Sequence, residues 1–335
     1  MKKNKLYLFA VLVLAWYVSA CSTDVAIQKL LGTSSEGPVF TGYRATGPGF
    51  EFAFSEPVKV LSLVFDPHQE VTSIEEGALV KVQVQHSLGV GAGVVADLLV
   101  EDLEGNTLNV LVPVRTRNNR IPGILINEIR TEYANPKTEF IELRTTGPGN
   151  LGALRVYAAG ISLDEPVYEF PPCEVKTGEY IVLHLRTLDP ASTDETGSSL
   201  GLSPGTEALT TARDFWAPGT AKLIRKTDTV FITDQDGQIL DAVMMSETAD
   251  SWWLKERFAH TAELLGKNTS WAAGSAEQGA FPGPVDAVAS QYNTTTRTVC
   301  RNEQGPDTNT SADWYTAATG NATPGAPNSR KKHVP

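Results

Sequence analysis

Cysteine is scarce in this chain: Cys21, Cys173 and Cys300 are its only three among 335 residues. So few thiols leave room for one disulfide within the chain at most. Beyond the first 20 residues, no apolar stretch approaches the ~20 residues that a membrane-spanning helix needs. The Gly-x-Ser-x-Gly motif, phosphate-binding loops and zinc-ligand spacings are also absent. The five histidines are scattered, which argues against a catalytic triad.

Positive charge is also in short supply. The chain has 28 lysines and arginines against 39 aspartates and glutamates. Three of the lysines lie in the first five residues, so without this segment 25 basic residues remain and the net charge is near -14. A body of this charge disfavours nucleic acid and anionic lipid as partners. The length and the 41% hydrophobic content fit about two globular domains.

The N-terminus carries the most informative pattern. Residues 1–5 are basic, residues 6–20 are apolar, and Ser19 and Ala20 directly precede Cys21. This order predicts a signal peptide over residues 1–20. The small pair followed by cysteine resembles the lipobox of bacterial lipoproteins. The resemblance implies cleavage before Cys21, lipid on its thiol and acylation of the new amino terminus, and two or more acyl chains anchor a protein stably. An ordinary signal peptide or a membrane span is the alternative, although the apolar run is shorter than the ~20 residues that a spanning helix needs.

The residue after Cys21 bears on the membrane that receives the lipid. Ser22 does not resemble the aspartate that marks inner-membrane retention in enteric bacteria. We therefore expect a lipid-anchored protein of the bacterial cell envelope, in the outer membrane. Residues 21–37 lack strong periodicity and are predicted to be a lipidated tether.

Strand patterns begin near residue 38. Short β-rich runs, separated by Gly and Pro, are typical of an antiparallel sandwich; they cover residues 50–54, 58–65, 78–85, 94–101 and 108–114. Residues 102–106 form the expected hairpin turn. The segments Phe52–Val58 and Gly105–Leu108 resemble those of bacterial immunoglobulin-like domains, which implies such a sandwich over residues 38–120.

A second ordered set of motifs follows. It comprises Leu125–Ile129, Glu139–Leu143, Gly152–Tyr157, Tyr168–Pro171, Gly178–Leu183, Thr229–Asp234, Asp236–Val243, Asp313–Trp314 and Thr323–Asn328. The set resembles the lamin tail domain, and this resemblance implies an immunoglobulin-like sandwich with inserts over residues 123–328. Residues 329–335 are predicted to be a basic tail. The expected fold class is all-β, with two immunoglobulin-like β-sandwiches in tandem and a short helical insert in the second.

The insert at residues 250–266 has the strongest helical pattern, with Leu254, Phe258, Ala262 and Leu265 on one face. Another insert, residues 187–219, contains a short helical possibility at 206–215. Trp252 and Trp253 are adjacent and cannot both point into the apolar face of the helix. Either one of them is exposed and recognises a partner, or both cover the open end of the sandwich.

Few side chains indicate chemistry. Cys173 and Cys300 form either one disulfide or two buried free thiols. Glu128, Glu139 and Glu142 are expected to bond neighbouring backbone rather than to act as acid or base. Asp234–Gly237 predicts a tight hairpin better than a calcium loop. We expect no metal, no cofactor and no catalytic residue.

The sequence thus favours a membrane-anchored envelope lipoprotein that acts as a non-catalytic binding or structural module, adhesin-like or part of envelope assembly. Its partners would be the lipid bilayer, through Cys21, and an envelope or extracellular protein or glycan. Two alternatives remain open: an accessory module of an extracytoplasmic hydrolase, and a carbohydrate-binding protein with an exposed aromatic row including Trp252, Trp253 or Trp216.

Overall fold

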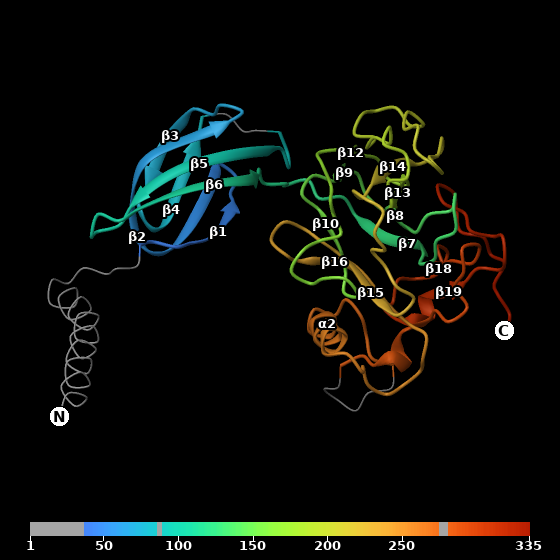
Figure 1. Cartoon of the computed structure of the whole chain (residues 1–335). Coiled ribbons are helices and arrows are strands. Elements are labelled where there is room, and N and C mark those ends of the chain that lie inside the picture. The colour runs from blue at the N-terminus through green and yellow to red at the C-terminus, as the bar shows by residue number, and fades with distance from the viewer. Residues whose placement is uncertain (1–36, 86–88, 275–280) are drawn as a thin grey trace, which may run out of the picture. The chain divides into compact units, whose positions relative to one another are not determined.

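The computed structural model describes residues 37–85, 89–274 and 281–335 (Figure 1). These residues form two compact units: unit 1 contains residues 37–85 and 93–116, and unit 2 contains residues 89–92 and 117–335. The described part is predominantly β with one α-helix, which confirms the all-β expectation at that level. Within it, no helix is long and apolar enough to cross a membrane. The predicted signal peptide and Cys21 lie outside the described residues.

Unit 1 is a single antiparallel sheet system in the order β3-β4-β2-β5-β6, with β1 also paired to β2. Its strands are β1 (Phe40–Ala45), β2 (Gly49–Asp66), β3 (Val71–Glu75), β4 (Gly77–Val84), β5 (Gly93–Glu101) and β6 (Thr107–Arg115). The turn between β5 and β6 has the predicted hairpin form, since Asp102 Oδ1 accepts hydrogen bonds from the backbone of Glu104 and Asn106.

The long strand β2 joins two halves of this sheet. Its first half pairs with β1 and β4, and its second half pairs with β5. The sequence predicted two separate strands here because Pro57 interrupts the pattern. In the structure Pro57 lies in the register shift between Ala53 and Val58, where its missing N–H breaks no ladder hydrogen bond. Alternate side chains along this strand face inward, and the buried Phe50, Phe52 and Phe54 supply part of the core of unit 1.

Unit 2 contains two larger sheets. One has the order β11-β10-β15-β16-β17, the other β14-β13-β8-β7-β18-β19, and β12 pairs with β9 in a two-stranded ribbon. The strands are β7 (Ile124–Arg130), β8 (Phe140–Thr145), β9 (Gly149–Asn150), β10 (Arg155–Ala158), β11 (Tyr168–Glu169), β12 (Glu174–Val175), β13 (Tyr180–His184), β14 (Arg213–Trp216), β15 (Asp228–Thr233), β16 (Ile239–Ser246), β17 (Val288–Ala289), β18 (Val299–Arg301) and β19 (Trp314–Thr316).

One apolar core lies between these two sheets. It joins Ile126 and Ile141 of one sheet to Val230 and Val243 of the other, and all four side chains are buried. The predicted turn at residues 234–237 forms the β15–β16 hairpin, with Gly237 at φ 80° and Asp234 Oδ1 accepting from the backbone of Gln238. Burial of this core holds the two sheets together. It thereby fixes the start of β15 and the end of β16, the ends away from the turn, where the candidate site begins.

The helical insert is shorter than predicted. Helix α2 (Glu256–Lys267) packs Phe258, Ala262 and Leu265 inward beside β15, but Leu254 precedes the helix and is 85% exposed. The prediction was wrong at the start because Asp250 and Ser251 belong to a loop that bonds residue 285 instead of capping a helix. The possible helix at 206–215 is also absent; its last residues form β14, which pairs in parallel with β13.

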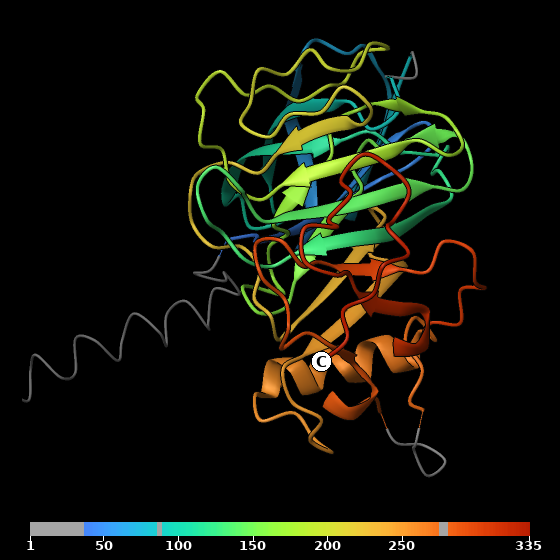
Figure 2. The same ribbon diagram turned by 90° about the vertical axis from the view of Figure 1, so that its right-hand side faces the viewer.

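The C-terminal segment, residues 318–333, lies across the larger sheet of unit 2 (Figure 2). The segment folds back on itself through Ala318 N to Lys331 O, and it pairs with the end of β19 through His333 N to Thr316 O. The predicted basic tail, residues 329–335, therefore contacts the sheet through Lys332 and His333. Backbone hydrogen bonds and the packing of Lys332 over the Tyr315 ring hold it there.

Candidate functional site

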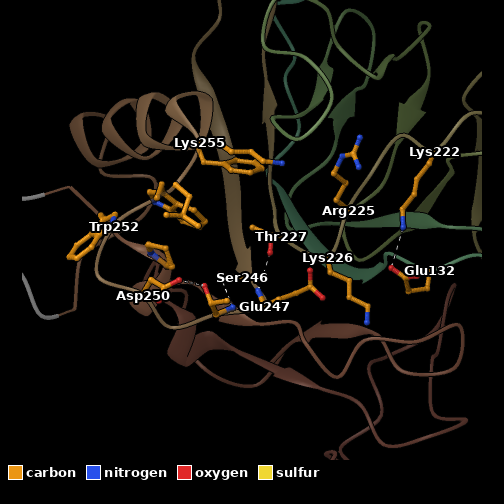
Figure 3. Close-up of a pocket in the computed structure, with 15 residues that line it drawn as sticks. Glu132, Lys222, Arg225, Lys226, Thr227, Ser246, Glu247, Asp250, Trp252 and Lys255 are labelled. Atoms are coloured by element: carbon orange, nitrogen blue, oxygen red, sulfur yellow. Dashed lines mark hydrogen bonds and ion pairs between the residues drawn. The ribbon is translucent and has the colours of Figure 1, made fainter.

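A pocket of about 530 Å³ opens beside the start of α2, a volume within the range of small-ligand sites. We call it the Trp252 pocket. Its lining divides into four chemical groups. The apolar group is Trp252, Trp253, Leu254, Phe258 and Pro284; the cationic group is Lys222, Arg225, Lys226 and Lys255; the hydroxyl group is Thr227, Ser246 and Thr248; the carboxylate group is Glu132, Glu247 and Asp250. Figure 3 shows Trp252 at one end and Lys222 with Glu132 at the other.

The two tryptophans have different roles. The Trp253 indole donates from Nε1 to the Pro282 carbonyl at 2.9 Å and packs at 5.5 Å from the Phe258 ring, so it belongs to the wall. Trp252 is 70% exposed, and its side chain has no hydrogen-bond partner among the described residues. Of the two interpretations for this pair, the structure favours exposure of one ring. Trp216, one of the three tryptophans named for an exposed aromatic row, is buried and stacked on His184.

The cationic end is positioned by a buried carboxylate. Asp228, at the start of β15, accepts hydrogen bonds from the backbone of Arg225 and Gly160. Burial raises the pKa of Asp228 to about 6, against the lowering effect of those N–H groups. The Arg225 and Lys226 side chains reach only backbone carbonyls, those of Gly160 and Gln291, at 3.3 and 3.4 Å. Neither forms an ion pair within the described part of the chain.

Lys222 differs from these two cations. Its ammonium group lies 3.2 Å from the Glu132 carboxylate, and both side chains are partly exposed. An exposed pair of this kind contributes about 0–1 kcal/mol. The pair neutralises one positive charge at the far end of the pocket, so Arg225 and Lys226 are the cations left at that end. Lys255, the fourth lining cation, lies directly before α2.

Between the two ends lies a polar loop that follows β16. Thr248 donates from its hydroxyl to Asp250 at 2.7 Å, and its backbone N–H donates to the Ser246 hydroxyl. The Glu247 backbone N–H donates to the Thr227 hydroxyl, which ties this loop to the start of β15. The Glu247 carboxylate makes no hydrogen bond or ion pair with another described residue. The middle of the pocket therefore presents carboxylate acceptors and hydroxyl groups.

The three glutamates of the lamin-tail-like motifs lie elsewhere, and each is buried with partners. Glu128 accepts from the Thr323 backbone and Glu142 accepts from the Gly325 backbone. Glu139 pairs with Arg186. The first two glutamates are register partners on β7 and β8, so neighbouring buried carboxyls receive the C-terminal segment. The prediction that these residues bond nearby backbone is confirmed for Glu128 and Glu142.

Burial dominates the electrostatics of this carboxyl pair. It raises the pKa of Glu142 well above its ordinary value, and the negative charge of Glu128 raises it further. Asp241 is a comparable case, with a pKa raised to about 6 by burial although Arg301 lies 2.6 Å away. These groups lie in the interior of unit 2 and do not line the Trp252 pocket.

Of the two alternatives for Cys173 and Cys300, the described structure has two buried free thiols rather than a disulfide. Cys173 lies beside the carbonyls of Glu174 and Glu195, and Cys300 lies on β18 beside Thr298 and Glu128. Each sulfur thus has its own separate surroundings. Burial raises the pKa of Cys173 to about 11, which keeps this thiol protonated and unreactive at neutral pH.

His184, one of the scattered histidines, is buried. Its Nε2 lies 2.8 Å from Asp214 Oδ1, and its ring stacks on Trp216 at 3.9 Å. No ligand-accessible face remains on it, because both side chains of the pair are at most 2% exposed. This pair links β13 to β14 and has a structural role.

Sequence reasoning found the two tryptophans but missed Lys222, Arg225 and Lys226. The available signal was three cations within five residues of an acidic chain.

The fold and the site together describe a β-rich protein of two compact units, the second of which carries the Trp252 pocket. A family model described as a second domain, of an uncharacterized Treponema protein family, matches residues 122–316, more than half of the chain. The chain belongs to this family.

Further comparisons add one relative. An uncharacterized protein of Treponema pallidum (strain Nichols) is 31% identical over 160 residues, which is 48% of this chain and 40% of that protein. The chain thus spans less than half the length of the relative it matches. No solved structure matches significantly. The matching family model names neither a lamin tail nor an immunoglobulin-like domain, so that resemblance remains a proposal.

Proposed function

We propose that this protein is an envelope lipoprotein that binds a partner non-catalytically through the Trp252 pocket. Lipid on Cys21 holds it in the outer membrane, and the two β-rich units are immunoglobulin-like modules, the second lamin-tail-like. The observation that carries the binding role is the Trp252 indole, 70% exposed at the edge of a 530 Å³ pocket. Tryptophan is among the side chains that most often dominate the binding energy of an interface when they are covered.

Three further features support this proposal. The loop that carries Trp252 is held by the Asp250 carbonyl, which accepts from the Val285 backbone, and by the Trp253 indole. A ring presented from such a fixed loop loses little conformational freedom on binding. The lipobox resemblance at Cys21 supports the anchor, and a bacterial relative is in keeping with it.

The anchor is tested by Cys21→Ala in the native cell. Without a thiol to receive lipid, the chain is expected to lose detergent-phase partitioning and to accumulate unprocessed or in the aqueous phase. Cys173→Ala is the matched control, because this thiol is buried in unit 2 and its loss leaves the anchor intact. Unchanged detergent partitioning of the Cys21 variant would show that the anchor is wrongly assigned.

A further inference from the structure

We propose that the Trp252 pocket recognises an acidic glycan, a chain of sugars that carry carboxylate groups. This inference rests on the proposed binding function and names the ligand class. It follows from three features that occur together: an exposed indole, a band of hydrogen-bond acceptors and two cations that lack an ion-pair partner.

The exposed indole suits the apolar face of a sugar ring. One face of many pyranoses presents only C–H groups, and these pack against the negative face of an aromatic ring. The exposed Trp252 ring is available for this contact. The Trp253 ring is not, since it already contacts Pro282 and Phe258. Leu254, 85% exposed, extends the same apolar edge.

The acceptors in the middle of the pocket favour a ligand rich in hydroxyl groups. Glu247 and Asp250 are exposed carboxylates that accept hydrogen bonds, and the Thr248 hydroxyl already donates to Asp250. Sugar hydroxyls donate to such acceptors. An acidic peptide offers one backbone N–H donor per residue, whereas a sugar unit offers several hydroxyl donors to these two acceptors. The acceptors of the pocket therefore favour a glycan over an acidic peptide.

The two cations specify a negative charge on that glycan. Arg225 and Lys226 contact only backbone carbonyls through their side-chain nitrogens. Guanidinium and carboxylate groups form strong paired hydrogen bonds, and the planar guanidinium matches carboxylate geometry. A glycan that stacks on Trp252 and extends along the pocket would bring a carboxylate to these cations, which line the same pocket.

The test uses the full-length chain in detergent micelles and two matched probes. One is a short oligogalacturonate and the other is the same oligosaccharide after reduction of its carboxyl groups. Binding is followed by calorimetry and tryptophan fluorescence. We expect the acidic oligosaccharide to bind about tenfold more tightly, which corresponds to ~1.4 kcal/mol, and the preference to weaken as salt screens the charges.

Variants separate the two recognition elements. Trp252→Ala should weaken both probes about tenfold, since it removes the stacking surface. Arg225→Ala with Lys226→Ala should abolish the preference for the acidic probe while binding of the neutral probe persists. Leu202→Ala and Lys59→Ala are matched controls, an exposed leucine and a lysine outside the pocket, and should change neither affinity.

Several outcomes would overturn the proposal: no binding of either oligosaccharide at millimolar concentration, equal affinities for both, or tighter binding of an oligoglutamate of the same charge. Crosslinking from position 254, an exposed residue that lines the same pocket, in intact cells keeps the underlying function separate. If an envelope partner is captured there and lost with Trp252→Ala while the oligosaccharides fail to bind, the binding function stands and the ligand class is wrong.

Discussion

At the scale of single residues, unit 2 buries an unusual set of carboxyl groups. Glu128 and Glu142 face each other across β7 and β8, and Asp228 and Asp241 are each nearly inaccessible. A buried charge is costly unless it is paired or hydrogen-bonded. Here the partners of the carboxyl groups are backbone N–H groups and Arg301. For Glu142, the hydrogen bonds lower the pKa by less than burial raises it. The consequence is a fold whose stability depends on protonation.

The first prediction concerns the slope of stability against pH. Above the ordinary pKa of glutamate, Glu142 keeps its proton in the folded chain and loses it in the unfolded chain. The free energy of unfolding therefore falls as pH rises, by up to ~1.4 kcal/mol per pH unit for this one proton, until its raised pKa is passed. Glu142→Gln should reduce the slope by this amount, measured by urea denaturation between pH 5 and about 7.

The exposed Glu165→Gln is the matched control and should leave the slope unchanged. Asp228 and Asp241, with pKa values near 6, remain in the Glu142 variant, so some pH dependence should persist. A slope identical to that of the original chain would show that Glu142 is ionised in the folded state.

At the scale of elements, the C-terminal segment is held by backbone donors rather than by an apolar face. Thr323 and Gly325 donate to Glu128 and Glu142, and the Asn328 side chain donates to the carbonyls of Asn127 and Arg301. Gly325 has a φ of 77°, and a Cβ there would lie 2.9 Å from Thr211 Oγ1 and 3.0 Å from Ala212 Cβ. Both the backbone angle and the crowding require glycine at this position.

Gly325→Ala and Gly320→Ala separate these two effects. Both glycines have positive φ, but a Cβ on Gly320 would meet nothing within 4 Å. We expect Gly320→Ala to cost about 1 kcal/mol from the backbone alone, and Gly325→Ala to cost about 1–3 kcal/mol more from overpacking. Chemical denaturation of both variants measures the difference. Equal losses would mean that residues 209–212 move aside freely.

The sequence predicted elements well where one local pattern decides. The alternating runs that became β4, β5 and β13 lie within a residue or two of their expected positions, as do the hairpin glycines Gly105 and Gly237. It failed where distant partners decide. β14 forms because β13 supplies a parallel neighbour, and the segment from Asp250 to Leu254 stays outside α2 because residues 282 and 285 bond it.

The same contrast applies to the candidate site. Trp252 and Trp253 stood out as an adjacent pair, but only their contacts show which ring is free. Arg225 and Lys226 lie some 27 residues before them and join the pocket because the β15–β16 hairpin returns the chain to that place. Nothing local in the sequence predicts that return.

At the scale of the whole molecule, the chain divides into two units with their own buried residues. The core of unit 2 draws on residues from Ile124 to Trp314, whereas Phe52, Val80 and Leu98 are buried within unit 1. Each unit is large enough to fold around its own core. Two-state behaviour is expected of each domain rather than of the whole chain.

Matched leucine substitutions test this division. Leu98 on β5 and Leu183 on β13 are both fully buried, one in each unit. Each change to alanine should cost about 2–5 kcal/mol, because it removes buried methyl groups and leaves a cavity. We expect calorimetry to show two unfolding transitions, with Leu98→Ala lowering one and Leu183→Ala lowering the other. A single transition that both variants lower equally would mean that the units unfold as one cooperative body, and the pocket of unit 2 would then depend on unit 1 for its stability.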